Sequence, residues 1–490
     1  MPEYLSPGVY VEEIEIGSKP IEGVSTSTAG FLGETERGPS TPRLITSWLQ
    51  FQRVYGGYLG NGKYLPQAVE GFYANGGQRC YIARVVDSEA GTATAKLTRG
   101  TEDALTVSAV GEGAWGNGVQ VSVGAGTFSG FKLVVRYRSL EELFDNLSTD
   151  SGSSDYYGKR VNGVSNFIVL SGETGDSGEA PDGPASFTAL SGGDDGTAPL
   201  DLDDFIRTDI DIPGQRKGLT AFNEIDEISI VYAPNAAAVT GLVGALITHC
   251  ENSKDRFAII DAAQGQSSVS GLNPRSGWDT KYAAFYYPWI KIYDPLSKTY
   301  QLAPPGGHMA GIYARSDTER GVHKAPANEV VRGAVDLEFA ITKGEQDVLN
   351  PRGVNCIRAF PGRGIRVWGA RTLSSDTLWK YINVRRLFIF LEESIDEGTQ
   401  WVVFEPNDEK LWARVKQSIT EFLTRVWKDG ALMGKTPDEA FFVKCDRTTM
   451  TQDDIDNGRL ICLIGVAPVK PAEFVIFRIA QWQGGSAVSE

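Results

Sequence analysis

The sequence has 490 residues, of which 41% are hydrophobic and 22% charged, and this balance excludes a disordered chain. Its formal net charge of −15 is the opposite of the basic footprint of nucleic-acid-binding proteins, so we expect no nucleic acid among its partners. No stretch is apolar for long enough to span a bilayer, and the first residues lack the pattern of a secretion signal. We therefore expect a protein made in the cytoplasm, without direct membrane insertion, and long enough for several packed units.

Cysteine and histidine are sparse and scattered along the chain. No two of the five cysteines have CxxC spacing, and their odd number argues against a disulfide framework. Three histidines do not make a zinc site of a common type. The sequence predicts reduced core thiols, hydrogen-bonded histidines, and no metal or cofactor site.

The first 27 residues are predicted to form an arm and a linker. Residues 9–14 have strand character and follow a Pro-Gly pair, and apolar residues become rare over 17–27. Residues 28–86 then begin an α/β core. The elements expected in it are a strand at 29–33, helices at 47–55 and 66–75, and a strand at 80–86.

Residues 87–224 have a different texture and are predicted to form a β-rich inserted outer domain. Short alternating runs at 119–123, 131–138 and 167–170 stand among clusters of Gly, Ser and Asp. The stretch is strongly acidic, which suits a solvent-facing unit.

Residues 225–349 return to an α/β pattern. Strands are expected at 228–233 and 257–261, with a helix at 236–252 between them, and this order is typical of a βαβ unit. The aromatic run 283–293 is expected to continue the same sheet.

The last third is predicted to be a C-terminal α+β domain over 350–467 followed by a strand arm over 468–490. The domain should contain a buried helix at 375–395, an amphipathic helix at 407–429 and strands at 440–446 and 460–466. In the arm, residues 473–482 follow two prolines and have strong strand character.

Asp261 and His308 resemble, in order and Gly-rich context, the first two members of a subtilisin-like triad, which raises the hypothesis of an enzyme. No serine follows in a suitable turn, since Ser374 and Ser375 stand where a helix is expected to start and fit an N-cap. No phosphate-binding loop occurs either. We therefore predict no enzyme and no catalytic residues, and keep a subtilisin-like hydrolase only as a distant third hypothesis.

Several motifs together resemble the tail sheath family of contractile phages, R-type bacteriocins and extracellular contractile injection systems. The most specific is the pair PPGGHMAGIYAR and RGVHKAPAN. The others, in family order, lie at 4–14, 66–72, 75–85, 350–355, 369–373, 381–387 and 404–407, and the match spans roughly 1–86 and 225–482.

The resemblance implies a multidomain α/β and α+β fold with a subtilisin-like α/β middle domain, a tube-facing C-terminal α+β domain, a β-rich insertion and extended strand arms at both ends. It also implies a structural sheath subunit, assembled in the bacterial cytoplasm and carried in a phage tail or a released injection particle. Such a subunit polymerises as a helix around an inner tube and contracts to drive the tube through a target envelope. The alternative is a static filament-like or capsid-like structural protein.

The partners implied are further copies of this chain in a helical homopolymer, the inner tube protein, baseplate and tail-end cap proteins, and sheath paralogues in the same particle. A terminal strand leaves its backbone groups unpaired unless a sheet edge accepts it. Pairing within the subunit is the alternative, but the linkers behind both strands and the resemblance favour donation to neighbouring subunits. The residues expected in these strands are Val9, Tyr10, Val11, Glu12, Phe474, Val475, Ile476 and Phe477.

A second surface is predicted from the charge pattern. Basic residues gather after residue 351 although the rest of the chain is acidic, which favours docking on an acidic protein partner. The basic residues expected to face the tube are Lys410, Arg414, Arg425 and Lys428, aided by Arg385 and Arg386.

Overall fold

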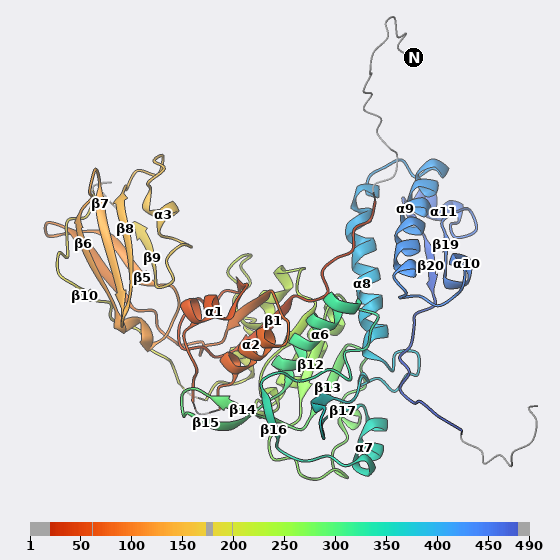
Figure 1. Ribbon diagram of the computed structural model, residues 1–490. Coiled ribbons are helices and arrows are strands. Elements are labelled where there is room, and N and C mark those ends of the chain that lie inside the picture. Colours follow the sequence, from red (N-terminus) through yellow and green to blue (C-terminus); the bar gives the residue numbers. More distant parts are fainter. Residues whose placement is uncertain (1–19, 61, 173–179, 198, 479–490) are drawn as a thin grey trace, which may run out of the picture.

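The computed structural model describes residues 20–60, 62–172, 180–197 and 199–478. Figure 1 shows a central α/β body, a β-rich unit to one side and a helical C-terminal unit to the other. Each has its own cluster of buried apolar side chains. Across the described ranges, no helix combines the length and the apolar character needed to cross a membrane.

The body is built around an eight-stranded sheet in the order β18-β17-β13-β12-β11-β1-β3-β2. Its six inner strands are parallel, and β18 and β2 close the two edges in antiparallel fashion. The strands are β1 (Ala29–Gly33), β2 (Arg43–Ile45), β3 (Cys80–Arg84), β11 (Ile230–Tyr232), β12 (Phe257–Asp261), β13 (Ala283–Tyr287), β17 (Val354–Phe360) and β18 (Gly364–Val367).

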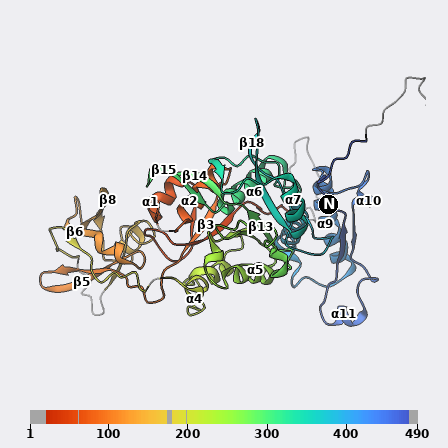
Figure 2. The same cartoon turned by 90° about the horizontal axis from the view of Figure 1, so that it is seen from below.

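The parallel strands are apolar runs because helices cover both faces of the sheet. The helices α2 (Leu65–Ala74) and α6 (Gly306–Arg320) pack together on one face, and α5 (Leu242–Ser253) covers the other (Figure 2). The remaining elements of the body are α1 (Trp48–Tyr55), α4 (Leu202–Ile206), α7 (Lys343–Leu349), and a separate sheet of β14 (Ile290–Asp294), β15 (Thr299–Ala303) and β16 (Ala334–Leu337).

The β-rich unit is inserted between β3 and β11 and consists of two antiparallel sheets around their own core. Its first and last segments run beside each other: Gly91 pairs with Asp194, and the Asp87 carboxylate accepts a hydrogen bond from the Thr197 amide. The elements are β4 (Thr94–Arg99), β5 (Glu102–Ala109), β6 (Val119–Ala125), β7 (Phe131–Tyr137), β8 (Leu140–Leu147), α3 (Tyr157–Arg160), β9 (Ile168–Gly172) and β10 (Thr188–Ala189).

The C-terminal unit consists of two long helices and a β-hairpin. In α9 (Glu409–Lys428) the apolar residues recur at helical spacing and pack against the hairpin and α8 (Ile382–Thr399), and Asp408 caps its first turn. The hairpin pairs β19 (Phe441–Lys444) with β20 (Leu463–Val466), flanked by the short helices α10 (Pro437–Ala440) and α11 (Gln452–Asp456).

Several predicted elements differ from the structure. The run 283–293 is two strands in two sheets, because Pro288 interrupts it and turns the chain. The helix expected at 236–252 begins only at Leu242, and the helix expected at 375–395 spans Ile382–Thr399. Strands β17 and β18 extend the central sheet, although the predicted boundary at 350 assigned them to the C-terminal unit.

Candidate functional site

The residues that resemble a hydrolase pair are buried and separate. Asp261 ends β12 and accepts a hydrogen bond from the Tyr232 hydroxyl, and its burial raises the pKa of the carboxyl to about 7. His308 lies in α6 with a buried, unpaired Nδ1, and desolvation lowers its pKa to about 4. Within the described chain no hydrogen bond joins the two.

The serines considered for the third position also have other roles. Helix α8 begins at Ile382, so the predicted N-cap at Ser374 and Ser375 is wrong. Ser375 instead donates to Asp279 over 2.5 Å, and the Ser374 hydroxyl accepts from the Asp376 amide in a local turn. In the described residues no group of three or more His, Cys, Asp and Glu side chains is arranged to hold a metal ion.

The C-terminal arm is anchored at one glutamate. Arg371 donates to both carboxylate oxygens of Glu473, over 2.7 and 2.8 Å, and the Tyr381 hydroxyl and the Asn350 amide donate over 2.9 and 2.8 Å. The Lys380 ammonium adds an ion pair at 3.3 Å. Burial alone would raise the pKa of Glu473, but these hydrogen bonds lower it to about 2.

Beyond this anchor the arm is exposed. Phe474, Val475, Ile476 and Phe477 are between 69% and 82% accessible, and the described residues 473–478 form no strand with the rest of the described chain. The predicted strand is therefore not formed within one subunit as far as the structure describes it. Adjacent exposed apolar side chains of this kind are typical of contact surfaces.

The base of this arm and the body together line a groove of about 1100 Å³. Its lining includes Arg320, Lys324, Arg358, Trp368 and Phe474 among others, so basic and aromatic side chains of the body face the same groove as Phe474 of the arm. The groove is large enough to receive a peptide segment.

The hairpin β19–β20 offers strand edges. In the described part of the chain these two strands pair only with each other as a sheet. The edges of a two-stranded sheet are the kind of site at which a further strand can pair.

The N-terminal linker runs along α8. The Val24 amide donates to the Ser394 hydroxyl over 3.1 Å, and Arg425 of α9 donates to the Ile21 carbonyl. The predicted strand residues Val9, Tyr10, Val11 and Glu12 lie outside the described residues.

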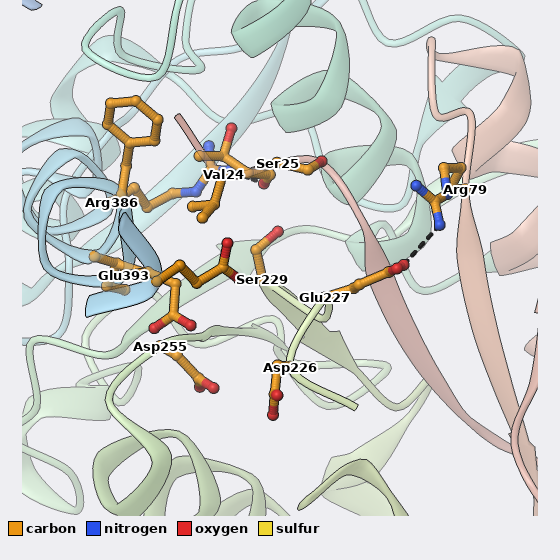
Figure 3. Close-up of a pocket in the computed structure, with 13 residues that line it drawn as sticks. Val24, Ser25, Arg79, Asp226, Glu227, Ser229, Asp255, Arg386 and Glu393 are labelled. Atoms are coloured by element: carbon orange, nitrogen blue, oxygen red, sulfur yellow. Dashed lines mark hydrogen bonds and ion pairs between the residues drawn. The ribbon is translucent and has the colours of Figure 1, made fainter. Parts of the chain in front are cut away.

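Where the linker crosses the body, an acidic cavity of about 290 Å³ opens beside α8 (Figure 3). Glu393 and Asp255 gather there, and Glu227 pairs with Arg79 over 2.6 Å. Burial, and next the charge of Asp255, raise the pKa of Glu393 to about 7. The pocket is therefore a polar cavity lined by the N-terminal linker, the body and helix α8.

The predicted basic residues fall into two groups. On α9, Lys410, Arg425 and Lys428 are exposed, and Arg414 is partly exposed beside Glu405. Arg425 also holds the linker, a structural role that the sequence pattern did not reveal.

Arg385 and Arg386 belong to the second group and are buried, so they present no charge at the surface of the single chain. Arg385 pairs with Glu392 over 2.5 Å, and Arg386 pairs with Asp317 of α6. The prediction that they aid a tube-facing surface is not supported by these positions, because each guanidinium is occupied inside the fold.

Comparisons with known proteins match several parts of the chain to tail sheath proteins. Residues 212–373 match the family described as the phage tail sheath protein central domain, and residues 374–481 match the phage tail sheath C-terminal domain. The tail sheath protein of Burkholderia phage BcepMu is 25% identical over 450 residues, which cover 87% of each chain.

Solved structures show the same similarity. A chain from the cryo-EM structure of the anti-feeding prophage baseplate aligns with a TM-score of 0.61 and 25% identity, covering 98% of this chain and 100% of that one. In fold, the chain is also similar to the sheath complex of the extracellular contractile injection system PVC in its contracted state. That alignment has a TM-score of 0.62 and 24% identity, and it covers 98% of this chain and 99% of the other.

Proposed function

The chain belongs to the phage tail sheath family, and from this premise we propose how it works as the sheath subunit of a contractile injection machine. Copies of the chain polymerise as a helix around an inner tube. Contraction of that helix drives the tube through a target envelope. Baseplate proteins and a cap hold its two ends.

The observation that carries this proposal is the C-terminal arm. Glu473 fixes the base of the arm to the body, and Phe474 to Phe477 extend from it into water. An anchored apolar segment that its own subunit leaves uncovered is suited to a neighbouring copy. Pairing by β-augmentation would satisfy its backbone and bury its side chains.

The hairpin β19–β20 is the acceptor that we propose, together with the N-terminal arm of another subunit. A contact in which one subunit donates and the next accepts is heterologous, and it generates a helix if it does not close into a ring. Arms behind extended linkers allow rigid subunits to rotate during contraction while main-chain pairing persists.

We propose that the C-terminal unit faces the tube and that the acidic insertion faces outward. The exposed side chains of Lys410 and Lys428 on α9, with the partly exposed Arg414, provide positive charge for an acidic tube surface. Arg385 and Arg386 are left out of this surface because they are buried.

We further propose that the body is a subtilisin-like domain without catalytic function. Asp261 and His308 are buried separately, and neither contacts Ser374 or Ser375 through a hydrogen bond in the described chain. Their role in this proposal is structural, and the protein is not an enzyme.

Negative-stain microscopy of the purified chain, alone and with tube protein, tests the proposal. Hollow striated cylinders that exist in a long narrow and a short wide form are expected. Cylinders of one fixed length-to-width ratio under every condition would identify a static filament instead. Absence of any regular polymer from folded protein with its tube and baseplate would contradict the proposal.

A further inference from the structure

Two cysteines stand opposite each other at the end of the C-terminal hairpin. Cys445 directly follows β19 and Cys462 directly precedes β20. The last pair of the hairpin is Lys444 with Leu463, so Cys445 and Cys462 are the next opposed pair in the same register. Opposed residues of antiparallel strands have Cα atoms about 4.5–5.5 Å apart, inside the range that a disulfide bridges.

The two side chains also share a face. Val443 and Ile464 are paired and belong to the apolar cluster around α9, and the cysteines lie two residues further along each strand. Cys445 is buried in that cluster and Cys462 packs against it with partial exposure. The two thiols lie within hydrogen-bonding reach of each other, so the side chains already face one another.

The surroundings favour sulfur chemistry at this pair. The hydrogen bond from Cys462, opposed by burial and aided by the nearby Lys416 ammonium, lowers the pKa of Cys445, whereas the same hydrogen bond raises the pKa of Cys462. A thiolate is the reactive form in disulfide exchange. By contrast, burial raises the pKa of Cys80 and of Cys356 to about 12.

We propose that Cys445 and Cys462 form a disulfide when the protein meets an oxidising small-molecule disulfide such as oxidised glutathione. One cysteine sulfur displaces a glutathione thiolate from the S–S bond, and the second cysteine then displaces the other glutathione. Each cysteine loses its thiol hydrogen, and both glutathiones leave as thiols. The protein pair is oxidised by two electrons, and the glutathione disulfide is reduced by two.

This bond closes the segment 446–461, which includes α11, into a covalent loop. It fixes the two strands of the hairpin at the end remote from the arm. The Thr449 hydroxyl, which donates to the Ile461 carbonyl over 2.8 Å, already holds the same loop just beyond the pair. The cross-link therefore reinforces an existing closure, and it does not depend on the sheath function.

The experiment treats the reduced full-length chain with oxidised glutathione, unfolds it, alkylates free thiols and measures intact and peptide masses. Wild-type protein is expected to lose two hydrogens, to retain three alkylatable cysteines of its five, and to yield a peptide linking 445 to 462. Cys250→Ser, which removes an unrelated buried thiol, should form the same link.

Cys445→Ser and Cys462→Ser each lack one of the two cysteines, so neither variant can form the disulfide. In either variant the remaining cysteine of the pair should retain glutathione, with at least about 10-fold more adduct than wild type, because no second thiol displaces it. The thermal midpoint should rise on oxidation for wild type and Cys250→Ser alone. Five alkylatable thiols in treated wild type, a link elsewhere, or a wild-type adduct as abundant as in the variants would overturn the proposal.

Discussion

Arg386 of α8 and Asp317 of α6 form a buried two-pronged ion pair, with nitrogen–oxygen distances of 2.9 and 2.6 Å. The same arginine donates to the Thr26 carbonyl over 2.7 Å, and the Thr26 hydroxyl donates to Asp317 over 2.6 Å. One charge pair thus joins the body, helix α8 of the C-terminal unit, and the N-terminal linker.

Asp317→Asn should therefore destabilise the protein by about 3 kcal/mol, because it leaves the Arg386 charge buried without a counter-ion. Urea unfolding measures the loss. Asp347→Asn is the matched control: its partner Lys343 lies 3.5 Å away, and both side chains are exposed, so a change within about 0.5 kcal/mol is expected. Equal effects in the two variants would contradict the central role of the buried pair.

Glu473→Gln should release the base of the C-terminal arm and cost about 2 kcal/mol, because its cationic partners remain without a carboxylate. The pKa of Glu473 is lowered to about 2, so its contribution is present above the unfolded pKa near 4.5 and is lost as pH falls toward 2. The stability gap between wild type and variant should narrow over that window. A gap that is constant from pH 5 to pH 2 would refute this.

Replacing Phe474, Val475, Ile476 and Phe477 with serine should abolish cylinder assembly and leave the monomer folded, because these side chains are largely exposed and lie outside the buried cores of the subunit. Circular dichroism and sizing report the fold and mass, and microscopy reports the cylinders. Phe128→Ser, an equally exposed change in the insertion, should assemble normally. Truncation after Pro471 or deletion of residues 1–16 should act like the serine variant, although the truncation also removes Glu473.

Charge reversal on α9, with Lys410→Glu and Lys428→Glu, should weaken co-assembly of sheath on purified tube, and more so at low salt, where electrostatic docking is strongest. Arg425 is left unchanged because it holds Ile21. Lys159→Glu with Lys298→Glu reverses two exposed charges elsewhere and should have no effect. Normal sheathing by the α9 variant at low salt would show that another face meets the tube.

Asp261→Asn should flatten the pH dependence of stability without creating or removing any hydrolytic activity. Burial raises the pKa of Asp261 to about 7. The contribution of the protonated carboxyl to stability is therefore complete below the unfolded pKa near 4, and it declines as the pH rises toward 7. Urea unfolding of wild type should lose about 2–4 kcal/mol over this range from this group, and the variant should not. A peptidase or esterase activity that vanishes in Asp261→Asn or His308→Asn would contradict a structural role.

The sequence predicted the central strands well because their apolar runs are buried on both faces, as in β1 and β12. It did not predict α6, whose glycines weaken any helical pattern. The reason lies in packing: a Cβ at Gly307 would overlap the backbone of Ala68, so the glycines allow α2 and α6 to approach closely. The packing of α2 against α6 thus outweighs the low helix propensity of these glycines, and this can be recognised only in the folded structure.

Among the residues of the candidate surfaces, those whose position depends on one helix were predictable, and those that depend on distant contacts were not. Amphipathic spacing predicted α9 and the exposure of Lys410 and Lys428, because the position of each residue around a single helix determines which face it occupies. The burial of Arg386 depends on Asp317, 69 residues away, and no local pattern indicates it. The hairpin that we propose as acceptor and the anchor at Glu473 likewise depend on contacts between distant segments.

The insertion leaves the body at Asp87 and returns beside it at Thr197, with Gly91 and Asp194 paired just beyond. A unit whose two ends are neighbours is a side branch of the chain, and the central sheet does not need it to connect β3 to β11. We expect that it can be replaced by a shorter connection, or by another folded module whose ends lie equally close. The fold thereby offers a natural grafting point, at which a displayed protein would be repeated once per subunit along any polymer that the chain forms.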